Sequence, residues 1–507
     1  MRKNVINTWA LAALAALSAP AVLTSCSDDD EVTTERNWST DGGLNAADNL
    51  LFDGTQIGNG DNEFVFTGTQ TLTKGTYTLK GWVYIADGAT LTIEPGTVIK
   101  GDKQTMAALI VERGGKLIAQ GTQTEPIVFT SEEAKGSRKP GDWGGVIICG
   151  KAPHNAGEAQ IEGGPRTKHG GSDATDNSGV LSYVRIEFAG YPFESDKEIN
   201  GLTLGSVGSG TQIDHVQVSY SNDDSYEWFG GTVNAKYLIA YNGWDDDFDT
   251  DNGFSGNVQY GLVVRNSRIA DKSQSNGFES DNDASGSTAT PVTSATFSNI
   301  TFIGPKAVDE NFVNSSDYIT GGDFNPNNGS GLGKFQAAMQ IRRGSRLNCV
   351  NSVAVGYPIG LILDNQRGDT QTQAANGNLT LQNLWFADMD IVGSDANNYY
   401  GDYLVTGYDG STPIVDSTQT SFSSRFFYAQ SGNAVKTTDE LLLTGSSLYS
   451  GLSANFMPQS GSPMLSAASW TAVTDSYFDK VSYIGAFANG DSWMNGWTNF
   501  DPNNTDY

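Results

Sequence analysis

The chain has 507 residues, with 30 Lys and Arg against 58 Asp and Glu, which gives a formal net charge of −28. A surface this acidic repels nucleic acid and anionic lipid head groups, so we expect no nucleic-acid partner. The same charge is compatible with cations, neutral glycans or a basic patch on a protein partner.

Residues 1–25 have the pattern of a secretory signal peptide, with two basic residues near the start and an apolar run at residues 9–23. The motif Leu-Thr-Ser-Cys that ends at Cys26 is typical of the cleavage site of bacterial lipoproteins. We therefore expect lipid on Cys26 to hold the exported protein at a membrane; an ordinary cleaved signal with an incidental cysteine is the alternative. No later segment approaches the ~20 apolar residues of a membrane-spanning helix.

The segment after the cysteine is polar and acidic. Residues 27–31, Ser-Asp-Asp-Asp-Glu, resemble the signal that sends lipoproteins of Bacteroidetes to the outer face of the outer membrane. With few apolar residues to bury, residues 26–48 are predicted to be a lipidated tether. The folded domain is then residues 49–507.

Short runs rich in Val, Ile, Tyr, Phe and Thr recur between clusters of Gly, Asn, Asp and Ser, and they predict an all-β protein. In the first part of the domain these runs are residues 81–85, 90–93, 107–111, 126–129 and 145–148. Cys149 and Cys349 both lie in apolar, strand-like runs, which favours buried free thiols over a disulfide.

A six-residue pattern with apolar first, fourth and sixth positions repeats along the chain. It occurs at residues 181–186, 213–218, 297–302, 350–355 and 381–386. Repeats of variable length around a constant apolar strand are typical of a parallel β-helix, whereas a propeller would have a more regular period. Asn299 and Asn383 fall at equivalent positions and could form a hydrogen-bonded ladder, or could simply reflect the preference of Asn for turns.

Residues 77–131, followed by Gly-Asp-Trp-Gly-Gly-Val at 141–146, resemble the right-handed β-helix lipoproteins of Bacteroidetes, a pectin-lyase-like family. Residues 484–487 and 493–500 resemble the ending of that family. The resemblance implies a single-stranded right-handed parallel β-helix with a C-terminal cap at about residues 480–507. Residues 309–332 and 364–378 are then long polar loop insertions. Similar proteins are commonly encoded near TonB-dependent outer-membrane transporters, which implies such a transporter as a partner.

Acidic residues concentrate between residues 222 and 283. Aligning Tyr226, Phe248 and Phe278 superposes Glu227, Asp249 and Glu279, at shifts of 22 and 30 residues. Because successive side chains of a strand alternate between faces, the aromatic rings should enter the core while the carboxylates form a column outside.

A column of carboxylates is costly unless a cation neutralises it or some groups keep their protons. Oxygen ligands suit Ca²⁺, and the scarcity of His and free Cys argues against Zn²⁺ and Cu²⁺. A solvated acidic face without metal is the alternative. The candidate cation ligands are Asp223, Asp224, Glu227, Asp245, Asp246, Asp247, Asp249, Asp251, Glu279, Asp281 and Asp283.

Aromatic residues among the acidic turns are candidates for contact with a sugar ring: Trp228, Trp244 and Tyr241. We therefore expect a surface lipoprotein that binds a polysaccharide or another nutrient, or an accessory component of a TonB-dependent uptake system. The alternative is a Ca²⁺-dependent polysaccharide lyase or a glycoside hydrolase, since both occur on this fold. The sequence does not choose between binding and catalysis. A lyase would need a base, for which the candidates are Lys272, Arg265, Arg342 and Arg343.

Overall fold

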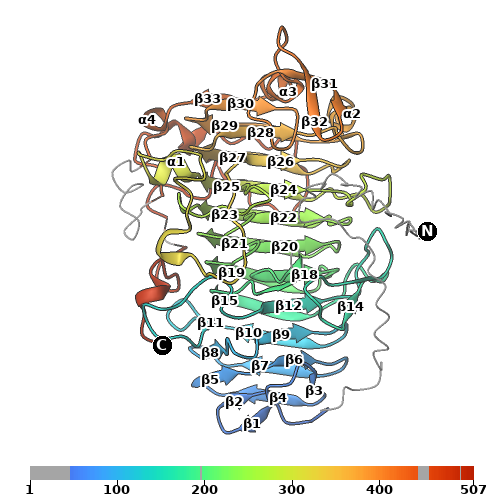
Figure 1. Ribbon diagram of the computed structural model, residues 1–507, viewed down its shortest axis with the longest axis vertical. Helices are drawn as coiled ribbons and strands as arrows, with labels where there is room; N and C mark the ends of the chain where they lie inside the picture. The colour runs from blue at the N-terminus through green and yellow to red at the C-terminus, as the bar shows by residue number, and fades with distance from the viewer. Residues whose placement is uncertain (1–45, 195–196, 444–455, 492) are drawn as a thin grey trace, which may run out of the picture.

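Two long sheets run the length of the molecule, and each coil of the chain adds parallel strands to them (Figure 1). The computed structural model describes residues 46–194, 197–443, 456–491 and 493–507. The predicted signal peptide, Cys26 and nearly all of the tether lie outside these residues. The architecture is the predicted parallel β-helix.

One sheet has 11 strands, joined in parallel from the first to the last. They are β3 (Phe64–Phe66), β6 (Trp82–Ile85), β9 (Ala108–Val111), β12 (Gly145–Cys149), β18 (Leu202–Gly205), β20 (Tyr226–Phe229), β22 (Phe248–Asp251), β24 (Phe278–Ser280), β26 (Ala337–Ile341), β28 (Ile359–Leu363) and β30 (Ile391–Ser394).

The other sheet has 16 strands, which are parallel apart from the first pair. They are β1 (Leu51–Asp53), β2 (Gln56–Ile57), β4 (Thr69–Leu72), β5 (Thr76–Leu79), β7 (Thr90–Ile93), β8 (Val98–Gly101), β10 (Lys116–Gln120), β11 (Ile127–Ser131), β15 (Gly179–Glu187), β19 (Gln212–Ser219), β21 (Asn234–Tyr241), β23 (Asn257–Val264), β25 (Thr296–Ile303), β27 (Asn348–Val355), β29 (Leu381–Ala387) and β33 (Ala434–Lys436).

Inward-facing aliphatic and aromatic side chains from both sheets form one continuous core. The repeat predicted from the sequence has the right register where Leu181 pairs with Ile213. It is off by one residue in a later coil, because Cys349, and not Val350, pairs with Leu381. Val350 instead packs outward against Val473 and Phe478. The sequence pattern therefore mistook Val350, which points outward, for a core residue. The residues that bury it come from far along the chain, so the local pattern could not distinguish it from a core position.

From β15 onward, each long strand of the 16-stranded sheet bends at one residue in the left-handed conformation. Bulky and amide side chains rather than glycine occupy the bends, although positive φ is unfavourable for them. The bend residues, with φ between 50° and 64°, are Tyr183, His215, Tyr237, Tyr260, Asn299, Asn351 and Asn383.

Stacking along the helix axis offsets the strain of these bends. Neighbouring rings from Tyr183 to Tyr260 stack with centroids 4.2–4.9 Å apart. Further along, Asn383 Nδ2 donates to Asn351 Oδ1 at 2.7 Å. An asparagine ladder is therefore present, although Asn383 is bonded to Asn351 and Asn299 instead accepts a hydrogen bond from Gln259.

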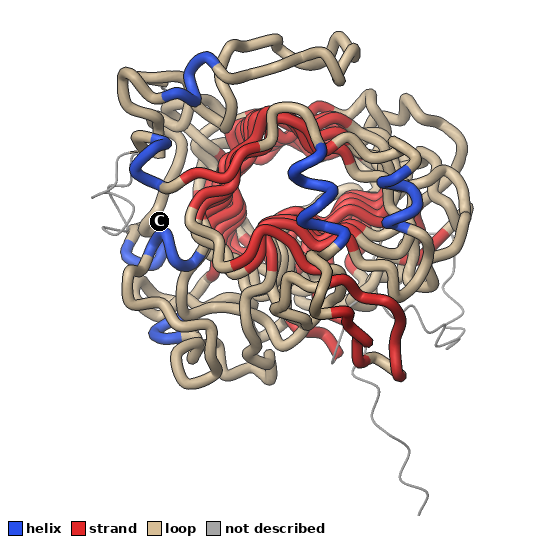
Figure 2. The backbone as a smooth tube through the Cα atoms, turned by 90° about the horizontal axis from the view of Figure 1, so that it is seen from above, coloured by secondary structure: helices blue, strands red, loops and turns tan. Residues whose placement is uncertain are grey.

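Residues 456–507, here called the C-terminal segment, return along the side of the coils against this row of bends (Figure 1). Gln259 makes two hydrogen bonds of 2.8 Å with the backbone of Asp479, and Gln217 makes an equivalent pair with Asn499. The segment thus lies along the flank of the solenoid. Helix α3 (Phe422–Ala429) covers the C-terminal end of the coils (Figure 2). Its Phe427 ring stacks on Phe386 with centroids 4.4 Å apart.

Loops between coils carry the remaining elements. They are the hairpins β13 (Ala159–Gln160) with β14 (Lys168–His169), β16 (Pro192–Glu194) with β17 (Lys197–Glu198), and β31 (Leu404–Asp409) with β32 (Thr412–Asp416), and the helices α1 (Pro305–Val308), α2 (Thr370–Ala375) and α4 (Thr438–Leu441). The insertion predicted at residues 364–378 contains α2, and the one at 309–332 folds back across the coils. None of the helices in the described part of the chain has the length and apolar character needed to cross a bilayer.

Candidate functional site: a buried column of carboxylates

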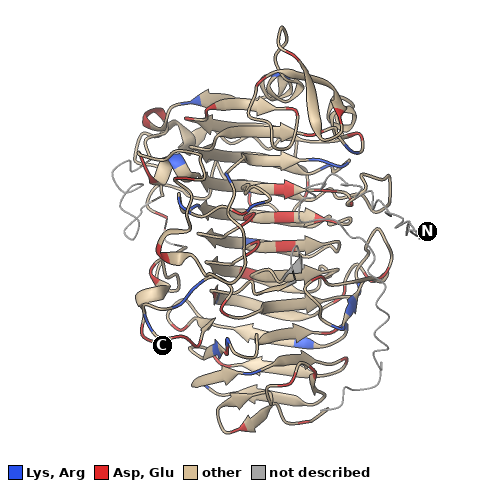
Figure 3. Cartoon of the chain, in the orientation of Figure 1, with Lys and Arg blue, Asp and Glu red and all other residues tan. Residues whose placement is uncertain are grey.

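Three successive strands of the 11-stranded sheet carry the predicted acidic column. Tyr226 pairs with Phe248 and Phe248 with Phe278, which places Glu227, Asp249 and Glu279 in one row. The three aromatic rings are fully buried in the core. The acidic stripe on neighbouring strands is visible in Figure 3. The alignment at shifts of 22 and 30 residues is therefore confirmed.

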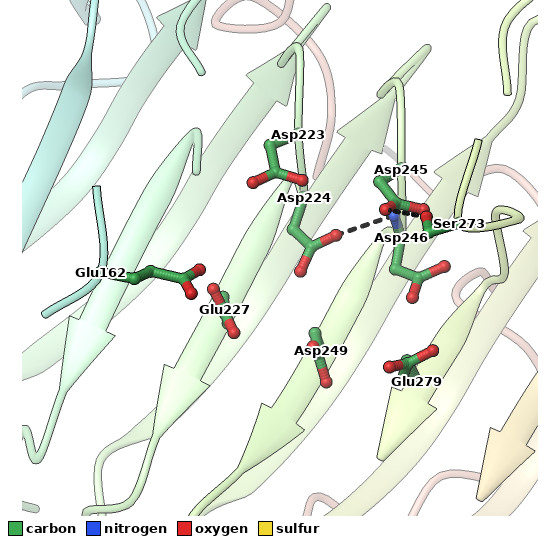
Figure 4. A pocket seen from close by; sticks show the side chains of 9 residues that line it. All are labelled: Glu162, Asp223, Asp224, Glu227, Asp245, Asp246, Asp249, Ser273 and Glu279. Atoms are coloured by element: carbon green, nitrogen blue, oxygen red, sulfur yellow. Dashed lines mark hydrogen bonds between the residues drawn. The ribbon is translucent and has the colours of Figure 1, made fainter. Parts of the chain in front are cut away.

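A second row of carboxylates comes from the turns that precede these strands (Figure 4). Asp224 Oδ1 accepts a hydrogen bond of 2.8 Å from the backbone N–H of Asp246, and Asp246 accepts one from the backbone of Asn276. Each side chain thus caps the backbone of the next coil, which fixes its position. Beside this row, Asp245 Oδ2 accepts a hydrogen bond of 2.5 Å from Ser273.

These carboxyl groups are buried in spite of their charge. Asp224, Asp246 and Glu227 expose only 4–7% of their surface. Burial, and secondarily the neighbouring carboxylates, raise the pKa of each of these three groups well above its ordinary value. The pKa of Asp249 is raised for the same reasons, with Glu279 as the strongest acidic neighbour. Burial and like charge therefore favour the protonated forms of these groups unless a cation is bound.

The arrangement fits a hard cation. Asp224, Glu227 and Asp249 each place an oxygen within 4.8 Å of the others, and so do Asp223, Asp224 and Asp245, with Asp224 common to both groups. Oxygens that share a Ca²⁺ at about 2.3–2.6 Å from the ion lie no more than about 5 Å apart.

The space between these groups is small. The residues of Figure 4 line a cavity of about 20 Å³, room for about one water molecule or one ion and far too little for a sugar ring. Asp249 Oδ1 is buried in it and takes no hydrogen bond from any residue that the structure describes. A buried carboxylate oxygen in that state is costly unless a cation or a proton satisfies it.

Two arginines close one end of the column. Arg342, which is 97% buried, forms ion pairs with Glu279 and with Asp281, the latter at 2.9 Å. Arg343 lies 3.0 Å from the other oxygen of Asp281. These carboxylates raise the pKa of Arg342 well above its ordinary value, in opposition to its burial. Arg342 is therefore a permanent cation that holds two carboxylates in place.

The four bases considered for a lyase do not meet that requirement. Arg265 is fully buried and lies 3.1 Å from Asp247 Oδ1, so it is committed in the same way as Arg342 and Arg343. Lys272 is exposed and is not among the residues that line the cavity. The residues around the column thus supply acids, and none of these four is placed as a proton-abstracting base.

The sequence matches the model of the pectate-lyase-like β-helix domain over residues 65–437. The chain belongs to the pectate-lyase-like β-helix family. A search of curated proteins finds no match. Among solved structures, the crystal structure of the Dettilon tailspike protein (gp208) aligns at 12% identity and a TM-score of 0.24, over 65% of this chain and 61% of that one. The aligned part is thus less than two thirds of the tailspike chain.

Not every predicted ligand of this β-helix protein lies at the two oxygen groups. Asp246 and Glu279 line the cavity, whereas Asp281 is held by the two arginines. Asp247 pairs with Arg265, although burial raises its pKa to about 7. Asp283 accepts hydrogen bonds from Ser285 and Ser287, which lower its pKa against the effect of partial burial.

Asp251 lies at the far end of β22 and accepts a hydrogen bond of 2.5 Å from the backbone of Asn252. It is absent from both oxygen groups. Asp251, Asp247 and Asp283 thus make local contacts in turns or ion pairs. The set of candidate Ca²⁺ ligands is therefore reduced to the residues of the two oxygen groups and the residues next to them.

The predicted sugar-binding aromatic residues are buried, and this expectation is corrected. Trp228 is fully buried and stacks on Phe254 at 5.3 Å. Trp244 is also fully buried and donates to the backbone of Gly331 at 2.9 Å. Tyr241 is 5% exposed and packs edge-on against Tyr220 and Phe500. These rings are not available to a ligand, because Trp228 lies in the core of the coils, the insertion at residues 309–332 covers Trp244, and the C-terminal segment covers Tyr241.

The sequence analysis missed two contributors to the column. Asn200 donates a hydrogen bond to Glu227 and lies one coil before Asp224 in the strand register. Extending the alignment by one coil, from Tyr226 to Leu202, would have found it. Glu162 lines the cavity from the insertion that carries β13 and β14, and no repeat in the sequence indicates its position.

Proposed function

We propose that this protein is a cell-surface lipoprotein that binds a glycan or another nutrient, and that Ca²⁺ in the acidic column fixes the coils that form the binding surface. The observation that carries the cation is the pair of buried oxygen groups that share Asp224. The ion would neutralise charges that the fold brings together on three coils.

Ca²⁺ held by residues such as Asp224, Glu227 and Asp249 would bridge consecutive coils. In both oxygen groups, two carboxylates come from the coil that contains β20 and the third comes from the coil that contains β22. Removal of the ion would leave the like charges unpaired and would loosen the turns that they cap. The ion's role is therefore structural support, because the cavity has no room for a sugar beside it.

The support for carbohydrate as the ligand class is membership of the pectate-lyase-like β-helix family. The support for a surface location is the lipoprotein motif at Cys26 and the acidic residues after it. An accessory role beside a TonB-dependent transporter is supported by the sequence resemblance alone. We propose it as the setting in which a lipid-held binding protein would act.

A glycoside hydrolase is a second candidate, and one observation favours it. Glycosidases use a pair of carboxyl groups, one of which has a pKa raised by its surroundings, and burial raises the pKa of Asp224 and of Asp249 in the column. Burial argues against it, because a substrate would have to reach carboxyl groups that line a cavity of about 20 Å³. A lyase is disfavoured further by the commitment of Arg342 and Arg343 to carboxylates.

The test is the thermal unfolding of a soluble form of the described domain with Ca²⁺ and with chelator, in the wild type and in Asp224→Asn. Ca²⁺ at 100 times its dissociation constant adds about 2.7 kcal/mol to the free energy of unfolding. We expect a rise of several degrees in the wild type and none in Asp224→Asn, because Asp224 belongs to both oxygen groups. Asn retains the oxygen that caps Asp246, so the variant should fold.

The control is Asp53→Asn, at an exposed acidic residue of β1 far from the column. Its response to Ca²⁺ should equal that of the wild type. An equal rise in Asp224→Asn would show that the ion binds elsewhere. Release of products from a polysaccharide panel in the same samples would identify an enzyme, and binding without product would identify a binding protein.

A further inference from the structure

A second and larger cavity lies between the 16-stranded sheet and the C-terminal segment, apart from the acidic column. We call it the outer groove. Its volume is about 240 Å³, against about 20 Å³ at the column. That is enough for a small organic ligand, whereas the column has room for an ion only.

The floor of the outer groove has one polar residue from each of four consecutive coils. Asn257 pairs with Thr296, and Thr296 with Asn348, while Thr380 follows on the next coil. Successive coils are about 4.8 Å apart, so these side chains form a straight polar row.

The asparagines of the row are already engaged. Asn348 Oδ1 accepts a hydrogen bond of 2.8 Å from the backbone of Thr380, and Asn257 Nδ2 lies 3.3 Å from Asp475 Oδ2. The hydroxyl groups of Thr296 and Thr380, in contrast, make no hydrogen bond among the described residues. They are therefore free to bond with a molecule in the groove, both as donors and as acceptors.

The facing wall consists of residues 472–475 and Phe478 of the C-terminal segment. Val473 and Phe478 are 4–7% exposed and pack on Val350 of the coils. The hydrogen bonds between Gln259 and the backbone of Asp479 tie the wall to the sheet. The groove is thus preformed, with Thr474 and Asp475 adding polar groups beside an apolar ring edge.

We propose that the outer groove binds a neutral saccharide unit. Its lining combines unengaged hydroxyls, amides and a carboxylate, while Val473 and Phe478 are almost fully covered, and this polar lining suits the many hydroxyl groups of a polyol. No Lys or Arg lines it, so it lacks the cation that would recognise a uronic acid or a phosphorylated sugar. This inference rests on the glycan-binding part of the proposed function and names the site and the ligand class.

The experiment is calorimetry and saturation-transfer NMR of the described domain with glucose, galactose, mannose, maltohexaose and cellohexaose, each with Ca²⁺ and with chelator. The variants are Thr296→Val with Thr380→Val, and separately Asp475→Asn. Valine keeps the shape of threonine and removes only the hydroxyl. The matched control is Thr69→Val, since Thr69 begins a strand of the same sheet, is exposed and lies outside the groove.

We expect at least one of these saccharides to bind in chelator, with an affinity at least tenfold weaker in the Thr296/Thr380 double variant and in Asp475→Asn. Thr69→Val should bind like the wild type. Failure of all five probes to bind, or equal binding by all variants, would overturn the outer groove as the site. Binding that needs Ca²⁺, is lost in Asp224→Asn and is unchanged in the Thr296/Thr380 double variant would support the proposed function while refuting the groove.

Discussion

The acidic column and the row of strand bends are both made by stacking equivalent residues of successive coils, but the stacking is favourable at the bends and unfavourable in the column. Each places one similar side chain per coil, so that equivalent residues stack along the helix axis. At the bends, rings such as Tyr183 and His215 stack and amides such as Asn351 and Asn383 bond to each other. In the column, Glu227, Asp249 and Glu279 stack like charges, and the following coil supplies a cation, Arg342, only at the Glu279 end.

This difference indicates that the row of bends supports the fold, whereas the column is a candidate for function. The side chains at the bends stack on one another or form hydrogen bonds with one another, and they pack against the C-terminal segment. They therefore require no partner from outside the protein. The column is only partly satisfied by Arg342 and Arg343, and its remaining carboxylates require protons or a cation. A stacked row that destabilises the fold unless a proton or a cation binds is a better indicator of a binding site than a stacked row that satisfies itself.

The largest effect should come from breaking the self-sufficient region. Gln259 is fully buried and makes hydrogen bonds with Asn299 and with both backbone groups of Asp479. Gln259→Leu would leave these partners unsatisfied, which costs about 2–4 kcal/mol. We expect that loss in denaturant unfolding, with or without Ca²⁺, together with faster proteolysis of the C-terminal segment.

Gln212→Leu is the matched control for this change. Gln212 is the first residue of β19 on the same sheet but is exposed, and among the described residues its side-chain amide donates only to Asp214. We expect a loss below about 0.5 kcal/mol. If both variants lost the same stability, the bonds to the C-terminal segment would not be what Gln259 contributes.

An intermediate effect should come from pH, and the column should supply its largest part. Asp224, Asp246 and Asp249 have pKa values raised by burial, so the folded state keeps protons that the unfolded chain loses above the ordinary carboxyl pKa of about 4. In chelator, the free energy of unfolding should therefore fall as the pH rises from about 5 to 8. We expect a fall of more than about 1.4 kcal/mol, the equivalent of one pKa unit at one carboxyl group.

Saturating Ca²⁺ should reverse this dependence, because an ion binds the ionised carboxylates more strongly as protons leave. The measurement is a series of thermal melts across that pH range, with Ca²⁺ and with chelator. The same negative slope in both series would argue against a cation in the column. A slope that persists in Asp224→Asn would assign it to other groups.

Much of the fold was predictable because its evidence is local and repeated. The pairing of Tyr226, Phe248 and Phe278 followed from the alternation of aromatic and acidic residues, and the strand register confirms it. The burial of Trp228 follows from the same alternation, because Trp228 lies two residues after Tyr226 and faces the core, whereas the burial of Trp244 does not. Trp244 is covered by an insertion that begins some sixty residues later, and no periodicity indicates where such a loop folds.

The same reason explains Glu162 and the outer groove. Both depend on segments that return to the coils from a distance: the insertion that carries β13 and β14, and the C-terminal segment. The sequence analysis identified the residues of each coil, but it had no information about which coil a returning segment would cover. The candidate site is therefore predicted best where it is made by consecutive strands.

The smallest effect should come from an acidic residue that is near the column in sequence but outside it in space. Asp283 accepts hydrogen bonds from Ser285 and Ser287, and these lower its pKa in spite of partial burial. Its contribution to stability is present above the ordinary carboxyl pKa and is lost as the pH falls. Because the turn is exposed, Asp283→Asn should cost less than about 1 kcal/mol, measured by denaturant unfolding at pH 7.

Asp283→Asn also tests how far the cation site extends along the acidic segment. Asp283 was predicted to be a metal ligand with the rest of the acidic segment, yet it belongs to neither oxygen group. The variant should keep the full response to Ca²⁺ that Asp224→Asn loses. A loss of that response in Asp283→Asn would mean that the cation lies toward the Asp281 end of the acidic segment, beside the arginines, and not between Asp224 and Asp249.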